Sequence, residues 1–97
     1  MRKTIVLSEE AKEDIFSLWQ YINEDNPAAA STLVAKIFEA FDLLSDFPLS
    51  GRACPEFTSD IRVRFVKKYA ILHRLSEESL EIIRVLHTAR DIRNIVD

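Results

Sequence analysis

The sequence has only one cysteine, Cys54, and only one glycine, Gly51, among its 97 residues. A single cysteine excludes an internal disulfide and a Cys-x-x-Cys metal or redox motif. A single glycine excludes the glycine-rich loops that hold phosphates and dinucleotides. The two histidines, His73 and His87, stand at no metal-ligand spacing from Cys54 or from each other. We therefore expect neither a cofactor nor a metal ion.

Long apolar runs are also missing from the sequence. The longest, Tyr69 to Leu72, has four residues, whereas a helix that crosses a bilayer needs about 18. The first residues, Met1-Arg2-Lys3, lead into no apolar signal segment, and we expect a cytoplasmic protein. Hydrophobic residues make up 47% of the chain and charged residues 30%. This size and composition are typical of one globular domain, so we expect a single domain over 1–97.

Acidic and basic residues are distributed unevenly along the chain. Positions 1–48 hold four Lys or Arg and nine Asp or Glu, whereas positions 49–97 hold nine and seven. The segment 61–74 has five cations and no acid: Arg62, Arg64, Lys67, Lys68 and Arg74. Proteins that act on nucleic acid are usually strongly basic, but this chain has a formal net charge of -3. A charge run in such a chain is most often a solvated strand face.

Two helices are predicted in the first half of the chain. Ser8 can cap the first helix, and Asn26-Pro27 can start the second, because asparagine caps helices and proline is tolerated at the first helical position. Apolar residues recur with a helical period at Ala11, Ile15, Leu18, Trp19 and Ile22, and again at Ala30, Leu33, Val34, Ile37, Phe41 and Leu44. Phe47-Pro48 ends the second helix. The short connection predicts an antiparallel helical hairpin.

Strands are predicted at the start of the chain and in its second half. Apolar or alternating segments lie at 3–7, 61–65, 69–75 and 80–87. Residues 45–60 are interpreted as an ordered loop, Lys67-Lys68 as a tight turn, and 88–97 as one or two helical turns capped by Thr88. Consecutive strands with short connections pair antiparallel. The order β-α-α-β-β-β predicts an α+β domain, with the helical hairpin packed on a small, mainly antiparallel sheet.

Four short motifs of this sequence are similar to those of one protein family. They are Leu18-Trp19-Gln20-Tyr21-Ile22 with Asp25-Asn26-Pro27-Ala28-Ala29-Ala30, then Leu44 to Arg52, Lys68 to Arg74, and Ile83 to Asp91. In this order they resemble the W-x-Y-I and N-P-x-A-A, L-x-x-F-P-x-x-G-R, central-strand and V-L-H-x-x-R-D motifs of ParE-type toxins of the RelE/ParE superfamily. The resemblance covers nearly the whole chain, and the family's fold agrees with the one predicted from periodicity.

The resemblance implies the toxin of a type II toxin–antitoxin module, of the kind that stabilises plasmids. ParE-type toxins poison DNA gyrase, whereas RelE-type toxins cut mRNA on the ribosome, and a shared fold does not separate the two activities. We expect a non-enzymatic gyrase inhibitor that a ParD-like antitoxin neutralises. A toxin-fold protein that has lost its activity and survives as a binding module is a third interpretation.

Ribosome-dependent mRNA cleavage is the alternative activity. Its candidate catalytic residues are Arg64, His87 and Arg90. Attack by a ribose 2′-hydroxyl needs a base, an acid and cations near the phosphate. The resemblance is incomplete here, because RelE-type nucleases usually have an arginine where this chain has Ala70 and a tyrosine where it has Ile95 or Val96. His87 could act as acid or base, but a strand-end histidine bonded to backbone or solvent is the simpler interpretation.

A binding mechanism assigns two sets of residues. Apolar side chains on more than one face of the helical hairpin favour a partner, and amphipathic helices commonly dock into such grooves. The antitoxin groove is predicted at Phe16, Trp19, Tyr21 and Phe38, although Trp19 also fits a core anchor. Contacts with the target or the antitoxin are predicted for the cations Arg62, Arg64, Lys67, Lys68, Arg90 and Arg93. The acids Glu9, Glu10, Glu13 and Asp14 are interpreted as solvated charges that offset the helix dipole.

Overall fold

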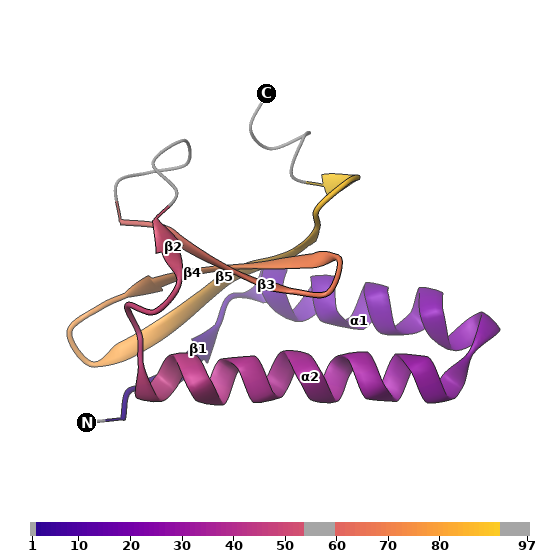
Figure 1. Ribbon diagram of the computed structural model, residues 1–97, viewed down its shortest axis with the longest axis horizontal. Coiled ribbons are helices and arrows are strands. Elements are labelled where there is room, and N and C mark those ends of the chain that lie inside the picture. Colours follow the sequence, from indigo (N-terminus) through magenta and orange to yellow (C-terminus); the bar gives the residue numbers. More distant parts are fainter. Residues whose placement is uncertain (1, 54–59, 92–97) are drawn as a thin grey trace.

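The computed structural model describes residues 2–53 and 60–91, which form two helices and one five-stranded sheet. The elements in chain order are β1 (Thr4–Leu7), α1 (Glu9–Asp25), α2 (Pro27–Asp46), β2 (Arg52–Ala53), β3 (Arg62–Val66), β4 (Tyr69–Leu75) and β5 (Ser79–His87). The two helices lie side by side along one face of a twisted sheet (Figure 1). The α+β fold predicted from the sequence is confirmed.

Both predicted helix starts are confirmed by their capping hydrogen bonds. The Ser8 hydroxyl accepts the N–H of Ala11 at 2.9 Å, and the Asn26 side chain accepts the N–H of Ala29 at 3.1 Å. Pro27 occupies the first turn of α2, where its missing N–H costs no helical hydrogen bond. The helices meet at Asn26, so the chain reverses direction with a single residue between them.

The sheet is mainly antiparallel, as predicted, and its strand order is β1-β5-β4-β3-β2. Only β1 and β5 pair in parallel, which the intervening helical hairpin makes possible. Strands β3 and β4 are joined by the two-residue turn Lys67-Lys68, in which Lys67 has a φ of 56°. Such short hairpins need a left-handed residue to match the twist of their strands.

The predicted loop over 45–60 is wrong in two places among its described residues, at 45–46 and at 52–53. Helix α2 continues through Asp46, and Ser45 is buried there because its hydroxyl donates a hydrogen bond to the Lys3 carbonyl. Residues Arg52 and Ala53 form β2 and pair with β3. A strand of two residues is too short to show an alternating pattern, so periodicity could not reveal it. Residues 92–97 of the predicted helical tail lie outside the described residues.

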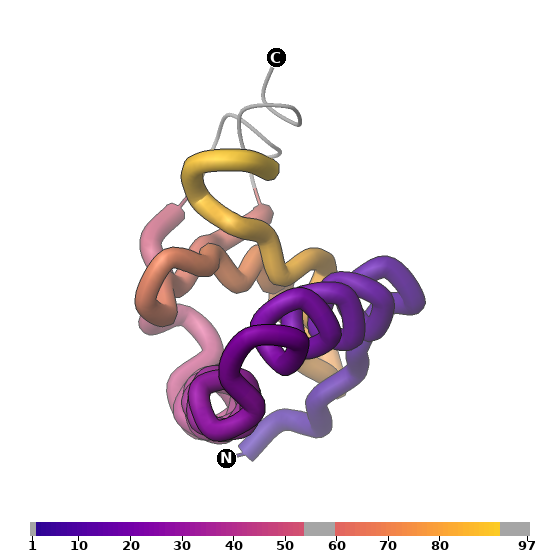
Figure 2. Tube along the Cα trace, turned by 90° about the vertical axis from the view of Figure 1, so that its right-hand side faces the viewer, coloured from indigo at the N-terminus to yellow at the C-terminus, as the bar shows by residue number. Residues whose placement is uncertain are grey.

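The sheet has an apolar cluster on each face. The larger cluster joins it to the helices and includes Leu18, Ile37, Phe41, Leu44, Ile71, Leu80 and Ile82. The smaller cluster includes no residue of α1 or α2. It consists of Ile61, Val63, Ala70, Leu72 and Leu86. Figure 2 shows the two helices together on one side of the sheet. The helical hairpin therefore covers one face of the sheet only. The side of the hairpin that faces away from the sheet is left without a covering element among the described residues.

Candidate functional site

An apolar groove lies between the two helices. Its cavity of about 280 Å³ is lined by Leu7, Lys12, Ile15, Phe16, Trp19, Val34 and Phe38, and we call it the aromatic groove. The rings of Phe16 and Trp19 stack with their centroids 6.3 Å apart. Phe16 is 58% exposed and Phe38 is 47% exposed, whereas Trp19 is half-buried. Three of the four residues predicted for the antitoxin groove are therefore gathered in one place.

Tyr21, the fourth predicted groove residue, lies elsewhere. The Arg90 guanidinium stands over its ring, 5.6 Å from the centroid, a cation–π distance. Both residues line a separate cavity of about 390 Å³ that also includes Tyr69 and Arg84. Burial raises the pKa of the Tyr69 phenol, while the positive charge of Arg90 opposes that shift. The structure thus joins Tyr21 to the end of the sheet and not to the aromatic groove.

Asp14 is not the solvated helix charge that the sequence predicted. Its carboxylate accepts two hydrogen bonds from Arg84, at 2.7 and 2.9 Å, and one from the Val85 N–H at 3.0 Å. The Asp14 side chain is only 15% exposed, and its hydrogen bond raises the pKa of Arg84. The Ser8 hydroxyl donates nearby to the Ile83 carbonyl. These contacts hold α1 against β5 beyond the end of β1.

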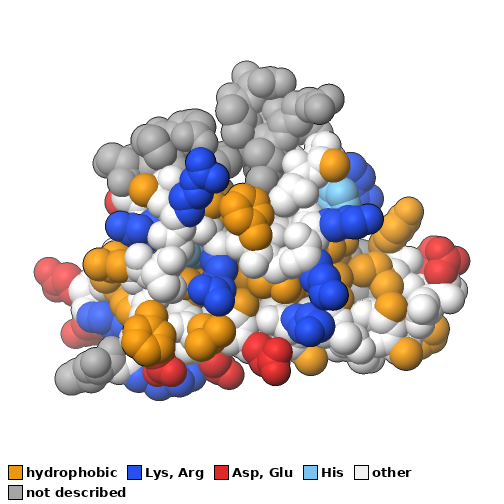
Figure 3. Space-filling view, viewed as in Figure 1, with side chains coloured by type: hydrophobic (Ala, Val, Ile, Leu, Met, Phe, Trp, Pro, Cys, Tyr) orange, Lys and Arg blue, Asp and Glu red, His pale blue; other side chains and the backbone are white. Residues whose placement is uncertain are grey.

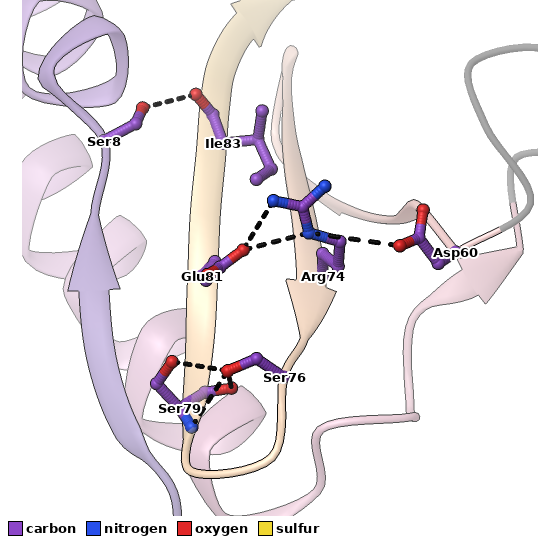
Figure 4. A network of polar contacts seen from close by, with 7 residues as sticks. All are labelled: Ser8, Asp60, Arg74, Ser76, Ser79, Glu81 and Ile83. Carbon is purple, nitrogen blue, oxygen red and sulfur yellow. Dashed lines mark hydrogen bonds and ion pairs between the residues drawn. The ribbon is translucent and has the colours of Figure 1, made fainter.

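The predicted basic stripe divides into structural and exposed cations. Arg62 donates to the Gly51 carbonyl at 2.7 Å and so ties the loop before β2 to β3. Arg74 donates twice to Glu81 and lies 4.0 Å from Asp60 (Figure 4). Lys67 and Lys68 are exposed at the β3–β4 turn. Arg93, which was also predicted to bind a partner, lies outside the described residues.

His73 is a buried residue whose role the sequence did not reveal. Its side chain is fully buried, and neither ring nitrogen has a hydrogen-bond partner among the described residues. Burial, together with the charges of Arg62 and Arg64, lowers the pKa of His73 from 6.5 to about 4. The ring packs so closely on Gly51 that a β-carbon there would clash with Nε2. This contact accounts for glycine at position 51.

His87 is held by backbone contacts at the end of β5. Its Nδ1 accepts the N–H groups of Ala89 at 3.2 Å and Arg90 at 3.3 Å, so a neutral ring carries its proton on Nε2. The His87 ring also meets the Tyr69 ring edge-on, with 5.3 Å between centroids. The backbone-bonded histidine expected from the sequence is therefore present. In the described part of the predicted tail, the side chain that accepts backbone N–H groups is that of His87 and not that of Thr88.

The three candidate nuclease residues do not share a described cavity. His87 lines a cavity with Lys67 and Lys68, Arg90 lines the one with Tyr21, and Arg64 lines neither. Within residues 2–53 and 60–91, no group of three His, Cys, Asp or Glu side chains could hold a metal ion. No helix in this part of the chain is long and apolar enough to cross a membrane.

Comparison with known proteins gives a consistent family assignment. Residues 5–92 match the family model for the ParE toxin of the type II toxin–antitoxin system parDE. The chain is 32% identical over 88 residues to toxin RelE1 of Caulobacter vibrioides, covering 90% of this chain and 95% of that protein. It is 34% identical over 86 residues to the putative toxin Y4kP of Sinorhizobium fredii, covering 89% and 88%.

Solved structures share the same fold. The chromosomal ParDE toxin–antitoxin system of P. aeruginosa contains a chain that matches with a TM-score of 0.77 at 16% identity, over 89% of this chain and 96% of that one. The RelBE2 toxin–antitoxin complex of Mycobacterium tuberculosis gives a TM-score of 0.67 at 22% identity, over 90% and 99%. At these identities the likeness concerns the fold alone.

Proposed function

The chain belongs to the ParE toxin family of type II toxin–antitoxin systems, and we propose that it inhibits DNA gyrase by binding it and that a ParD-like antitoxin neutralises it. The proposal separates two binding events. The antitoxin occupies the aromatic groove, and gyrase contacts another part of the surface. No covalent chemistry is required of the toxin.

The aromatic groove supports the antitoxin part of the proposal. Phe16 and Phe38 are large apolar side chains that remain about half exposed on one side of the helical hairpin. An amphipathic helix can lay its apolar face into such a groove, and buried aromatic rings commonly dominate the energy of an interface. Lys12 also lines the groove, where it forms an ion pair with Glu9 at 3.3 Å. The solved relatives of this fold include ParDE and RelBE assemblies.

The contacts of His87 are the observation that favours binding over mRNA cleavage. Its Nδ1 already accepts two backbone N–H groups, which leaves Nε2 as the only nitrogen that could exchange a proton with a substrate. Arg64, the candidate cation on β3, lines no described cavity with His87. Cleavage needs the acid–base group and the cation that stabilises the phosphate within reach of one reacting centre. A binding toxin needs no such arrangement.

A supercoiling assay tests this proposal. Toxin released from its antitoxin should block DNA supercoiling by purified gyrase and leave mRNA intact in a reconstituted translation reaction. Added antitoxin should restore supercoiling for the wild type. The variant Phe16→Asp should still block gyrase but respond to antitoxin only at much higher concentrations. Ribosome-dependent cleavage together with normal gyrase activity would contradict the proposal.

An mRNA endoribonuclease is the second candidate, because two curated relatives carry the names toxin RelE1 and toxin RelE2. If His87 were its acid or base, His87→Gln would abolish toxicity and preserve binding to the antitoxin. The present proposal predicts instead that the wild-type toxin cuts no transcript, so that His87→Gln has no cleavage to lose. Loss of transcript cleavage in that variant would decide for the nuclease.

A further inference from the structure

A second cavity, larger than the aromatic groove, lies on the other side of α2. It measures about 590 Å³ and separates α2 from the β3–β4 turn. Its described lining includes Leu33 and Lys36, whereas the aromatic groove includes Val34 and Phe38. Because each helical residue turns by about 100°, these two pairs lie on opposite flanks of the buried stripe that contains Ile37. The two cavities therefore open on different sides of one helix.

The charge of this second cavity is positive, and we call it the lysine cavity. Lys36 comes from α2, and Lys67 and Lys68 come from the β3–β4 turn, with His87 beside them. None of the described residues that line it is acidic. The first turn of α2 also borders it and carries no acidic side chain to offset the helix dipole. Figure 3 shows Lys and Arg side chains gathered between α2 and the turn.

The walls of the lysine cavity are apolar. Ile22, Leu33 and the small side chains of Ala28 and Ala29 line it together with Tyr69. Three cations around an apolar floor suit a ligand that carries both carboxylates and apolar side chains. A nucleic acid would gain little from three lysines on a chain of net charge -3, because its affinity depends on neutralising many phosphates.

The conformation of Lys67 provides independent support. Its φ of 56° lies in the left-handed region, where glycine and asparagine are favoured over lysine. Backbone strain of this kind is commonly retained at functional sites. Glycine or asparagine would form this turn with less backbone strain. The turn has a lysine instead, and its cation lies at the cavity.

We propose that the lysine cavity binds an acidic segment of the toxin's protein target, with apolar side chains against Ile22 and Leu33 and carboxylates at Lys36, Lys67 and Lys68. This inference rests on the proposed function and names the chemistry of the target contact. The target is favoured over the antitoxin because the two cavities open on different sides of α2, and the proposed function already places the antitoxin's helix in the aromatic groove.

Charge reversal at the cavity tests the inference on the full-length toxin. Lys36→Glu combined with Lys68→Glu should weaken binding to gyrase at least tenfold in 50 mM salt, and the loss should shrink in 400 mM salt because screening weakens the contact. Antitoxin affinity should stay within twofold of wild type. Arg52→Glu is the matched control for the single variant Lys36→Glu, because it makes the same change of charge at an exposed position on β2. This control should leave gyrase binding unchanged.

A second measurement does not depend on gyrase being the target. A peptide of alternating glutamate and leucine residues, added to ¹⁵N-labelled toxin, should shift the amide resonances of Lys36, Lys68 and Tyr69, and the double variant should lose these shifts. Absence of the shifts would overturn the inference even if gyrase is inhibited. Tighter binding of single-stranded RNA at the same residues would also overturn it, as would an equal loss of antitoxin affinity in the double variant. Peptide shifts without gyrase binding would instead refute the proposed target and leave the cavity's chemistry supported.

Discussion

The two flanks of α2 present opposite chemistry to the surroundings. The aromatic groove is formed by α1 and α2 and offers stacked or exposed rings such as Phe16 and Phe38. The lysine cavity is formed by α2 and the β3–β4 turn, with single residues of α1, β4 and β5, and it offers cations around mainly apolar walls. Neighbouring residues, Leu33 and Val34, contribute to different surfaces because a helix turns its side chains around its axis. One helix can therefore serve two partners, and the difference in chemistry predicts which variants affect which partner.

The largest effect should follow from placing a charge in the aromatic groove. Phe16→Asp removes an exposed ring that stacks on Trp19 and puts a carboxylate where an apolar helix face would dock. Antitoxin affinity should fall by about 4 kcal/mol, close to a thousandfold, as measured by calorimetry. Phe47→Asp, at an equally exposed ring beyond the end of α2, is the matched control and should change affinity little. Equal losses of antitoxin affinity in both variants would show that the aromatic groove is not the antitoxin site.

Acid should weaken the whole fold and both surfaces with it. The folded-state pKa of His73 is about 4, below its usual 6.5, so the unfolded chain binds a proton that the folded chain excludes. Stability from this residue is complete above pH 6.5 and falls as the pH drops to 4, by about 3 kcal/mol in all. His73→Leu should reduce the difference in unfolding free energy between pH 7 and pH 4 by that amount in urea titrations. An unchanged difference would show that the ring is accessible to protons.

Loss of the contact between α1 and β5 should weaken binding in the aromatic groove more than binding in the lysine cavity. Asp14→Ala removes three hydrogen bonds and leaves Arg84 without its carboxylate partner, so the unfolding free energy should fall by about 2 kcal/mol. Because α1 supplies four residues of the aromatic groove but only Ile22 of the described lining of the lysine cavity, antitoxin affinity should fall more than gyrase affinity. Glu13→Ala, at an exposed position on the same helix, is the control. A larger loss for gyrase would contradict this division.

The smallest effect should separate stability from target binding. Lys67→Asn places a residue that tolerates a positive φ in the β3–β4 turn, and the unfolding free energy should rise by up to about 1 kcal/mol. The same change removes a cation from the lysine cavity, so gyrase binding should weaken. Lys67→Arg keeps the charge and the strain, and it should alter neither property strongly. Stronger gyrase binding by the more stable Asn variant would exclude Lys67 from the target contact.

The sequence predicted the elements that have a periodic pattern or a cap. Ser8 and Asn26 are caps that can be identified from residue type alone, and the alternation after Ile61 predicts strands. By contrast, β2 has only two residues, and its pairing with β3 depends on contacts across the chain. Asp14 looked like its exposed acidic neighbours, because nothing in its local sequence shows that Arg84 will lie opposite.

The candidate site was only partly predictable for the same reason. Phe16, Trp19 and Phe38 converge because helical periodicity determines their side of the hairpin. Tyr21, two residues after Trp19, lies on nearly the opposite side of α1 and contacts Arg90 instead. The lysine cavity combines Lys36 with Lys67 and Lys68, which are 31 and 32 positions later in the chain, a proximity that only the fold creates. The burial of His73 against Gly51 likewise depends on tertiary packing.

The most direct test measures two variants against two partners. Phe16→Asp and the double variant Lys36→Glu with Lys68→Glu should each be titrated with antitoxin and with gyrase at 50 mM salt. We predict that the first variant loses antitoxin affinity only and the second loses gyrase affinity only. If both variants lose the same partner, or if neither loses any, α2 does not separate two binding surfaces and the account is wrong.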